Sequence, residues 1–383
     1  MNARGAGPAG LAWPALVLTA GLATRLQPLS SVRAKAALPV AGRPLIARIL
    51  QWLHDAGVRR AVLNLHHRPD SITTVVGDGT QFDMAVRYSW EREVLGSAGG
   101  PARAIPLLES DRFLIVNGDT LTDVDLHALC AQHVDTNALV TMAVVDADPR
   151  YNAIVADAAG IVTAFASREP ATREPANRQP ANHQPANREP ANRQPENPEP
   201  ENREPENPTF GTLGTSGTPG TALRRFHFIG VQVVNASVFA GVSPDHKAET
   251  VHGIYPGLIA SRPGAVRIFH TTREFHDIGS PRDYLHTAST FAEREGRPLD
   301  RGVDVAIAAD AALSNTILWD RVTVGAGARL TNCVVADDVH VPEGAAYENC
   351  SLVMRGHEMI VTPFQWIDAS SNTSQTKKST RSP

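Results

Sequence analysis

The sequence predicts an α/β fold with a doubly wound, mostly parallel mixed sheet, and three observations support it. Short apolar runs alternate with segments of helical spacing over the first 166 residues. Several of these runs are continuously apolar, as expected of strands that are covered on both faces. With 383 residues the chain can also bury a full core. A βαβ rhythm of this kind is typical of a sheet with helices on both faces.

The expected elements follow one another along the chain. Helical spacing of Leu45, Ile49 and Leu53 predicts a helix over 44–56, which ends at Gly57. Further helices are expected over 100–108 and 281–292. The expected strands are 15–19, 61–65, 86–90, 113–116, 138–145, 228–234 and 266–270.

The composition changes abruptly at Arg168. From there to Asn207 the chain consists of eight consecutive five-residue units, such as REPAN and RQPEN, each with a proline and no apolar residue larger than alanine. Such a segment cannot build a core. We predict a disordered insertion over 168–223 that interrupts one domain, 14–294, because loop closure becomes only slowly less favourable with length. A partner-binding role for the repeats is the alternative.

A six-residue period begins further on. Apolar or small residues recur at that spacing, with His340 out of pattern, in the set Val322, Ala328, Val334, Ala346 and Leu352. A hexapeptide period predicts a short left-handed β-helix over 303–356, with a small β-meander as the alternative. The polar end, 368–383, is expected to be a disordered tail.

Charge and cysteine content exclude several classes of function. The net charge of −4 provides no basic surface for nucleic acid or an anionic membrane. Three widely spaced cysteines argue against a disulfide framework or a zinc site and favour a reducing compartment, so we expect a cytoplasmic protein. The apolar run before residue 20 faintly resembles a signal peptide, but it contains Pro14 and is interpreted as a buried strand. No stretch reaches the ~18 apolar residues of a membrane span.

Chemistry is first suggested by the loop after strand 15–19. It reads Ala20-Gly21-Leu22-Ala23-Thr24-Arg25-Leu26. Small residues after a strand let backbone N–H groups approach phosphates closely. Arg25 adds a guanidinium fork that matches phosphate oxygens, and Lys35 follows ten residues later. The spacing differs from both the P-loop and the dinucleotide fingerprint.

The run from Leu18 to Ile46 resembles the signature of sugar-1-phosphate nucleotidylyltransferases, A-G-x-G-T-R-L-x-P-L-T followed by P-K-x-x-x-P. Two positions depart from it: Ala23 replaces the second glycine and Ala34 precedes the lysine in place of proline. The resemblance implies a Rossmann-like nucleotidyltransferase domain in which this loop wraps a triphosphate and in which Arg25 and Lys35 are catalytic. The implied nucleotide-binding residues of the loop are Leu18, Ala20, Gly21 and Thr24.

Further segments resemble the same family in the same order. Leu95-Gly96-Ser97-Ala98-Gly99 resembles L-G-T-A-G, which implies that Gly96, Ser97 and Gly99 contact the nucleobase. A glycine-rich turn that opens a helix is the alternative.

Two aspartates are candidates for a metal site. The apolar strand 113–116 leads to Asp119, at the carboxyl edge where open α/β sheets bind ligands. The segment from Phe275 to Leu285 resembles D-x-G-T-P-x-x-Y. The resemblance implies that Asp119 and Asp277 hold Mg²⁺, which prefers oxygen ligands. Asp283 is the rival but falls in the expected helix, and His276 is interpreted as a neighbour.

The residues of the acceptor site are less well matched. Asn152 lies where the family has Y-G near the sugar, and Gly230 lies in a strand that resembles the border of the sugar pocket. The lysine that grips the sugar phosphate has no counterpart; Arg168 is the candidate, with Arg224 or Arg225 as alternatives.

The implied reaction converts an NTP and a sugar-1-phosphate into an NDP-sugar and pyrophosphate. The sugar phosphate is itself a nucleophile, which agrees with the lack of a convincing Ser/His/Asp or Cys/His arrangement. The layout resembles mannose-1-phosphate guanylyltransferases and favours GTP, while dTTP or UTP with a glucose or N-acetylmuramate type of sugar remain open. The alternatives are a non-catalytic regulatory relative and an acyltransferase, for which the coils are too few. A homo-oligomer formed through the coils is also expected.

Overall fold

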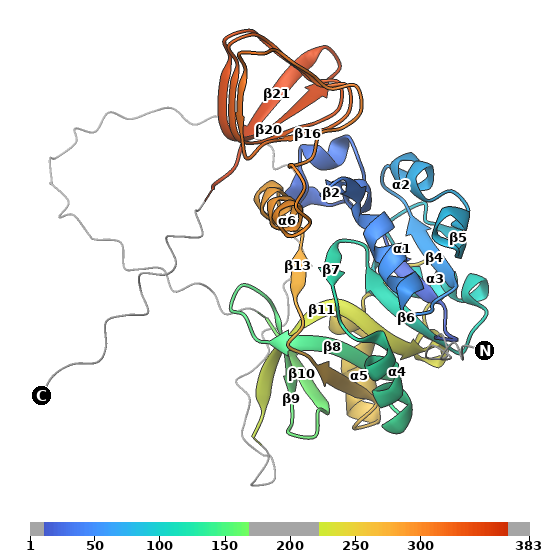
Figure 1. The fold of residues 1–383 in the computed structure, drawn as a ribbon. Coiled ribbons are helices and arrows are strands. Elements are labelled where there is room, and N and C mark those ends of the chain that lie inside the picture. Colours follow the sequence, from blue (N-terminus) through green and yellow to red (C-terminus); the bar gives the residue numbers. More distant parts are fainter. Residues whose placement is uncertain (1–10, 168–221, 367–383) are drawn as a thin grey trace, which may run out of the picture.

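A computed structural model describes residues 11–167 and 222–366. Its centre is a nine-stranded mixed sheet with the order β10-β9-β11-β6-β1-β4-β5, in which β8 pairs with β11 and β12 with β8 (Figure 1). The strands are β1 (Ala15–Leu18), β4 (Arg60–Leu65), β5 (Ala85–Trp90), β6 (Arg112–Asn117), β8 (Val140–Asp146), β9 (Ala153–Ala156), β10 (Val162–Ala166), β11 (Arg224–Asn235) and β12 (Val266–His270).

The pairing is parallel in one part of the sheet and antiparallel in the other. Strands β6, β1, β4 and β5 are parallel neighbours, and β12 runs parallel to β8. Strand β11 is antiparallel to β6, β8 and β9. A mixed sheet with a parallel core is therefore confirmed, but its antiparallel part is larger than the predicted mostly parallel sheet implies. Strand β9 pairs with β10, which precedes residues 168–221, and with β11, which follows them. Strands from both sides of the predicted insertion therefore belong to one sheet.

Helices cover both faces of the sheet. Ala15 and Val17 of β1 face one core, which α1, α2, α4 and α6 cover, whereas Leu16 faces a second core beneath α3 and α5. The helices are α1 (Leu45–Asp55), α2 (Pro69–Val76), α3 (Gly96–Leu108), α4 (Leu126–Asp135), α5 (Tyr255–Ser261) and α6 (Pro281–Arg294). This two-sided burial explains the continuously apolar strands.

Short elements connect these layers. Two small antiparallel ribbons pair β2 (Pro39–Val40) with β3 (Arg43–Pro44) and β7 (Thr120–Thr122) with β13 (Phe275–Asp277). The 3-10 turns are η1 (Thr24–Leu26), η2 (Leu29–Ser31), η3 (Lys35–Ala37), η4 (Thr80–Phe82) and η5 (Ala236–Phe239), and η6 (Thr250–Ile254) is a π-helical turn.

Residues 300–363 form a stack of coils at one end of the molecule, next to α6 and β2 (Figure 1). Equivalent residues of successive coils pair in parallel; Cys333, for example, pairs with Cys350, 17 residues later. The last strand, β21, instead turns back and pairs antiparallel with β20. The strands are β14 (Ala306–Ile307), β15 (Ala312–Ser314), β16 (Ile317–Leu318), β17 (Thr323–Val324), β18 (Arg329–Val335), β19 (His340–Val341), β20 (Ala346–Arg355) and β21 (Glu358–Pro363). We call residues 300–363 the coil stack.

The expectation that buried residues recur strictly every six positions is wrong in part, because each coil has 17 residues. Val322, Ala328 and Val334 are buried, but Ala346 is exposed. A 17-residue coil is one residue shorter than three hexapeptides, so the inward positions shift in the next coil. His340 consequently pairs with the outward Thr323, while its neighbours Val339 and Val341 are buried.

Helix α3 begins one turn earlier than expected, at Gly96. Its first amide groups are satisfied by another segment: Ala98 N donates to the Ala248 carbonyl (2.9 Å), and Ser97 N donates to the Glu249 carboxylate (3.2 Å). The insertion 168–223, the tail 368–383 and Arg168 lie largely or wholly outside the described residues. Among those residues, no helix is long and apolar enough to cross a membrane.

Candidate active site

The loop after β1 lines an open cavity of about 210 Å³ at the carboxyl end of the parallel strands. Six of the predicted site residues meet there, in the set Leu18, Gly21, Thr24, Arg25, Lys35 and Asp119. Gly279, two residues after Asp277, lines the same cavity. The structure therefore joins a loop from the start of the chain with a segment from beyond the insertion.

Close backbone packing at Gly118 brings two strand ends together. Gly118 N donates to the Leu18 carbonyl (2.9 Å), and a Cβ at Gly118 would lie 2.7 Å from that oxygen. A side chain there would separate the end of β6 from the end of β1. The glycine thus sets the distance between the phosphate loop and Asp119.

Ala23, which replaces the family glycine, adopts a left-handed conformation with φ 49°. This conformation disfavours residues with a Cβ by about 1–2 kcal/mol, whereas glycine adopts it without that penalty.

We expect Ala23→Gly to raise the free energy of unfolding by roughly 0.5 kcal/mol, since the relieved strain is partly offset by about 0.5–1 kcal/mol of added unfolded-state entropy. Chemical denaturation measures it. Ala36→Gly is the matched control, because Ala36 is buried and has no left-handed backbone, so this variant should lose stability. A loss for Ala23→Gly as large as the control's would contradict the strain argument.

Lys35 lies between two carboxylates. Its Nζ donates to Asp119 Oδ2 at 2.7 Å and lies 3.9 Å from Asp277 Oδ1. The two aspartates are brought together by the β7–β13 ribbon, in which Asp277 pairs with Thr120 and Ile278 N donates to the Asp119 carbonyl (3.3 Å). The predicted proximity of the two aspartates is thus present in the structure.

Electrostatics at Asp277 reflect this crowding. Burial raises the pKa of the Asp277 carboxyl, and the nearby Asp119 raises it further, while Lys35 and Arg25 act in the opposite direction. Two carboxylates that repel each other in a partly desolvated position favour a shared cation. Oxygen ligands of this kind suit Mg²⁺, which keeps water or substrate phosphate in its remaining positions.

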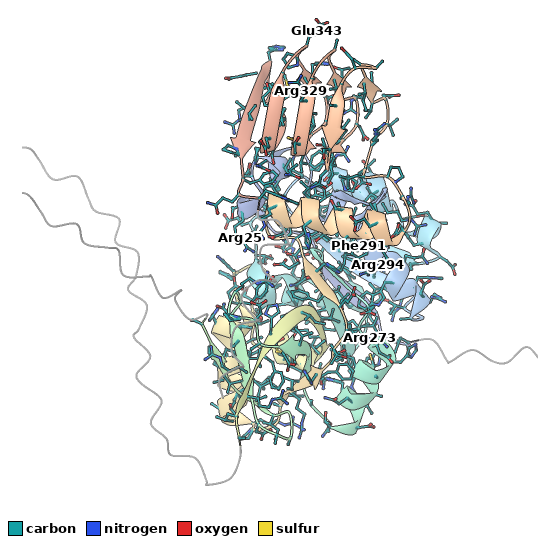
Figure 2. All side chains as sticks on the ribbon, turned by 60° about the vertical axis from the view of Figure 1, so that its left-hand side comes forward. Arg25, Arg273, Phe291, Arg294, Arg329 and Glu343 are labelled. Carbon is teal, nitrogen blue, oxygen red and sulfur yellow. The ribbon has the colours of Figure 1, made fainter. Side chains whose placement is uncertain are left out.

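Arg25 approaches the same position from the other side. A Cβ at Gly279 would lie 3.4 Å from both an Arg25 guanidinium nitrogen and Asp277 Oδ2. Within residues 11–167 and 222–366 no hydrogen bond or ion pair engages this guanidinium. Figure 2 shows Arg25 near one end of α6, between the coil stack and the sheet. Its fork is exposed and available to an anion.

The two rival residues make other contacts, although the Asp283 carboxylate also lies close by, 3.2 Å from a Cβ placed at Gly279. Asp283 lies in the first turn of α6, where its backbone N–H donates to Ser280 Oγ (3.2 Å) and its carboxylate accepts from the same hydroxyl (2.7 Å). This is N-terminal capping, as expected from its place in the helix. His276 points to the opposite face of the β7–β13 ribbon and lines a separate cavity with Phe291 and Arg294.

The glycine-rich turn of 95–99 is packed against another segment. A Cβ at Gly96 would lie 2.6 Å from the Ala248 carbonyl, and one at Gly99 would lie 2.5 Å from the His246 carbonyl. Ser97 Oγ donates to Glu249 (2.6 Å). These contacts explain the small residues structurally, and their role in nucleotide binding stays a prediction.

A buried polar link that the motifs did not reveal joins this turn to the phosphate loop. Thr19 N donates to Asn64 Oδ1 (2.6 Å), Asn64 Nδ2 donates to Glu91 Oε1 (2.8 Å), and Leu95 N donates to Glu91 Oε2 (2.9 Å). Asn64 and Glu91 are only 4% and 6% exposed. The available signal was an asparagine inside the otherwise apolar run 61–65.

Removal of this link should destabilise the protein. Asn64→Ala leaves Thr19 N and one Glu91 oxygen buried without partners, so the free energy of unfolding should fall by about 1–3 kcal/mol. Asn64→Asp keeps the shape of the side chain but places a second carboxylate next to Glu91, so at neutral pH the free energy of unfolding should fall further than in Asn64→Ala. Denaturant titration of both variants measures these losses, and values within about 0.5 kcal/mol of the unsubstituted chain would contradict the role of the link.

The predicted acceptor residues lie in the antiparallel half of the sheet. Gly230 has φ 79° at an irregularity of β11, and a Cβ there would lie 2.9 Å from Thr120 Oγ1. Asn152 immediately precedes β9, and its neighbour Tyr151 stacks on His227 with ring centroids 4.0 Å apart. Both rings also lie near Phe275, two residues before Asp277, with centroids 6.0 Å and 5.1 Å from its ring, so this aromatic pair is on the side of the metal-site candidates. Burial raises the pKa of Tyr151, and the Asp277 carboxylate raises it further.

The two alternative arginines, Arg224 and Arg225, lie at the start of β11. Arg224 pairs with Asp146 at 3.2 Å and is 60% exposed. Arg225 occupies the next position of β11. Arg168 lies outside the described residues, so the choice among the three stays a prediction.

Comparison with known proteins shows what this arrangement is similar to. Residues 14–177 match the nucleotidyl transferase family. A mannose-1-phosphate guanylyltransferase of Mycobacterium tuberculosis is 33% identical over 156 residues, which cover 40% of this chain and 44% of that protein. An N-acetylmuramate alpha-1-phosphate uridylyltransferase of Neisseria meningitidis is 42% identical over 115 residues, 30% of this chain and 50% of that protein.

The solved structures extend the likeness in fold. HddC from Yersinia pseudotuberculosis aligns with a TM-score of 0.51 and 21% identity, over 73% of this chain and 99% of its own. The matched part of this chain spans about half the length of the curated relatives named above. The resemblance to sugar-1-phosphate nucleotidylyltransferases is thus confirmed in sequence for the first part of the chain, and the mixed α/β nucleotidyltransferase fold for most of it.

Proposed function

We propose that this chain transfers a nucleotidyl group from an NTP to a sugar-1-phosphate, with release of pyrophosphate. The observation that supports the proposal most directly is the cavity that Arg25, Lys35 and Asp119 line together, with Asp277 Oδ1 3.9 Å from the Lys35 ammonium. Two cations and two carboxylates at the end of a parallel sheet suit a reaction between two phosphates. The similar proteins named above act on sugar phosphates.

The residues of the cavity would share the work as follows. Backbone amides of the loop around Gly21 and the Arg25 fork would bind the triphosphate. Lys35 would contact phosphate oxygens and hold the α-phosphate in line with the sugar phosphate. No protein base is required, because the sugar phosphate is already ionised at neutral pH. The chain thus contributes positioning and charge neutralisation.

Mg²⁺ is proposed as the cofactor, with Asp119 and Asp277 as its protein ligands. Their shared position and their mutual repulsion fit a cation with oxygen ligands. When bound, the ion would neutralise charge on the phosphate groups.

GTP and mannose-1-phosphate are the favoured substrates, supported by the layout of the chain and by one of the similar proteins. UTP or dTTP with another sugar-1-phosphate is the alternative, supported by the uridylyltransferase match. Asn152 and Gly230, with an arginine near the insertion, are proposed for the sugar phosphate.

We also infer that the coil stack is a short left-handed β-helix that supports a homo-oligomer. The parallel pairing at 17-residue intervals, close to three hexapeptides, supports the helix. A cytoplasmic location is supported by three free, buried cysteines.

A pyrophosphate-release assay over a matrix of NTPs and sugar-1-phosphates tests the function. One NTP and sugar-1-phosphate pair should release pyrophosphate faster than all others, and this release should cease when EDTA removes Mg²⁺. The Lys35→Ala variant provides the inactive background. If no pair exceeds that background while an NDP-sugar still binds the chain, the regulatory alternative holds.

A further inference from the structure

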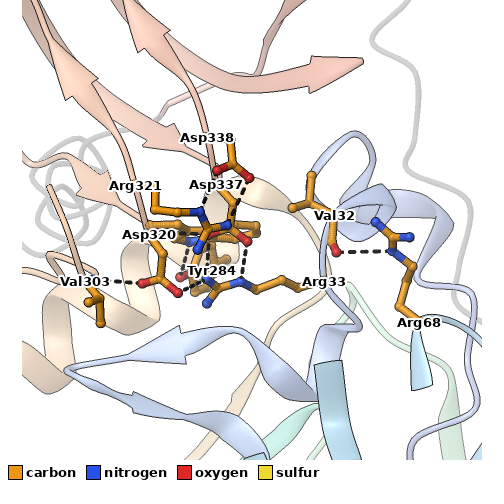
Figure 3. Close-up of polar contacts among 10 residues, drawn as sticks. Val32, Arg33, Arg68, Tyr284, Val303, Asp320, Arg321, Asp337 and Asp338 are labelled. Atoms are coloured by element: carbon orange, nitrogen blue, oxygen red, sulfur yellow. Dashed lines mark hydrogen bonds and ion pairs between the residues drawn. The ribbon is translucent and has the colours of Figure 1, made fainter. Parts of the chain in front are cut away.

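Arg33 connects the phosphate-binding region to the coil stack. It lies two residues before Lys35, between η2 and η3. Its Nε donates to Asp337 Oδ2 (2.8 Å), and one terminal nitrogen donates to both Asp337 Oδ1 (2.5 Å) and Asp320 Oδ2 (2.6 Å). Figure 3 shows this guanidinium between the two aspartates, which lie at equivalent places of successive coils.

The pairing is largely shielded from water. The side chain of Arg33 is 18% exposed and that of Asp337 is 12% exposed. The guanidinium also lies 5.1 Å from the centre of the Trp319 ring, a favourable arrangement for a cation. Burial acts to lower the pKa of Arg33, but the two aspartates outweigh it and raise the pKa overall. A bidentate, part-buried ion pair of this kind fixes geometry more strongly than a surface pair.

The other side of the same segment is bound to the sheet domain. Arg68 Nε donates to the Val32 carbonyl (3.1 Å), as Figure 3 shows. Ala34 N donates to Ser71 Oγ (2.9 Å). The backbone immediately before Lys35 is therefore held by α2 and its preceding loop on one side and by the coil stack on the other. The Lys35 ammonium reaches Asp119 from that fixed backbone.

We propose that Arg33, Asp320 and Asp337 are positioning residues through which the coil stack holds Lys35 in the nucleotide-binding cavity. The coil stack thereby acts on phosphate binding without contributing a side chain to the cavity, since none of its residues lines it within the described part of the chain. The inference rests on the proposed function for its effect on catalysis. Its structural part, the dependence of the Lys35 segment on the coils, does not.

Asp337→Asn is the principal test, with Asp338→Asn as the matched control. Both substitute an amide for a carboxylate at adjacent positions of one coil, but Asp338 pairs with Arg321 instead of Arg33. We expect Asp337→Asn to lower kcat/KM for the NTP about tenfold to 100-fold, because small displacements of a positioned group have effects of this size. The KM for the sugar-1-phosphate and the Asp338→Asn kinetics should change less than about twofold.

Hydrogen exchange provides a readout that does not depend on activity. Amides of residues 31–38 should exchange faster in Asp337→Asn than in the unsubstituted chain, because local opening follows the loss of local contacts. In Asp338→Asn their exchange rates should not change. Arg33→Gln removes the contact from the other side and leaves the bonds within the coil stack intact, so it serves if Asp337→Asn fails to fold. Arg33→Lys, which keeps the charge but not the fork, should recover part of the loss.

The outcomes separate the two proposals. Unchanged exchange over 31–38 in both Asp337→Asn and Arg33→Gln overturns the positioning role, whatever the activity. Faster exchange in a chain that releases no pyrophosphate with any substrate pair upholds the positioning role and refutes the proposed function. Faster exchange with an unaltered kcat/KM for the NTP overturns the link from the coils to catalysis.

Discussion

Asp277→Asn is expected to lower turnover about 10³-fold while leaving the metal-free protein at least as stable as before. The carboxylate is one of two proposed Mg²⁺ ligands, and charge stabilisation by such an ion is worth several kcal/mol in the transition state. In the metal-free protein the same group is unfavourable. Its pKa is raised by burial and by Asp119, so its ionised form weakens the folded state above the unfolded-state pKa.

The measurement combines pyrophosphate release with thermal unfolding at neutral pH, with and without Mg²⁺. The unsubstituted chain should gain melting temperature from Mg²⁺, because a ligand bound only to the folded state stabilises it. The melting temperature of Asp277→Asn should not rise with Mg²⁺. Asp283→Asn is the control, since the Asp283 carboxylate accepts a hydrogen bond from Ser280, the N-cap of α6, and its loss should affect stability without removing the response to Mg²⁺. An Asp277→Asn variant with normal turnover at limiting Mg²⁺ would exclude Asp277 as a ligand.

Arg25→Ala is expected to lower turnover about 10²–10³-fold, or roughly 3–4 kcal/mol, the usual effect of losing one pre-placed donor to a charged transition state. Arg25 is exposed and makes no ion pair within the described residues, so its removal should change the free energy of unfolding by less than about 0.5 kcal/mol. Loss of activity without loss of stability is therefore the specific expectation.

Single-turnover pyrophosphate release at saturating substrates measures this effect. Arg25→Lys should recover part of the rate, because the charge remains while the bidentate fork is lost. Arg329→Ala, on the outer surface of the coil stack, is the control for removal of a surface arginine (Figure 2). Turnover for Arg25→Ala that matches this control would remove Arg25 from the mechanism.

Much of the fold could be predicted because its signals are local. Strand β1, helix α1 and helix α6 appear within a few residues of where apolar spacing and Gly57 or Pro281 place them. The strands β9, β10 and β13 and the helices α2, α4 and α5 were not predicted. They are short, and tertiary pairing outweighs their weak local preference.

The coil stack shows the limit of counting apolar residues. A more reliable signal was present in Asn315, Asn332 and Asn349, which recur every 17 residues and hydrogen-bond from coil to coil (2.7 and 2.9 Å). All three have positive φ, a conformation that asparagine tolerates better than most residues. The turn residues, which need that conformation in each coil, repeated more strictly than the apolar ones.

The sequence by itself determined which residues are candidates for the cavity, since the phosphate loop, Lys35, Asp119 and Asp277 each stand in a recognisable local context. Only the tertiary structure decided how they meet. It set Lys35 between two aspartates 158 residues apart in the chain (119 and 277), linked the loop to Glu91 through Asn64, and connected Arg33 to the coil stack. Local patterns depend on neighbours along the chain, whereas these contacts depend on strand order and coil register, which no single segment encodes.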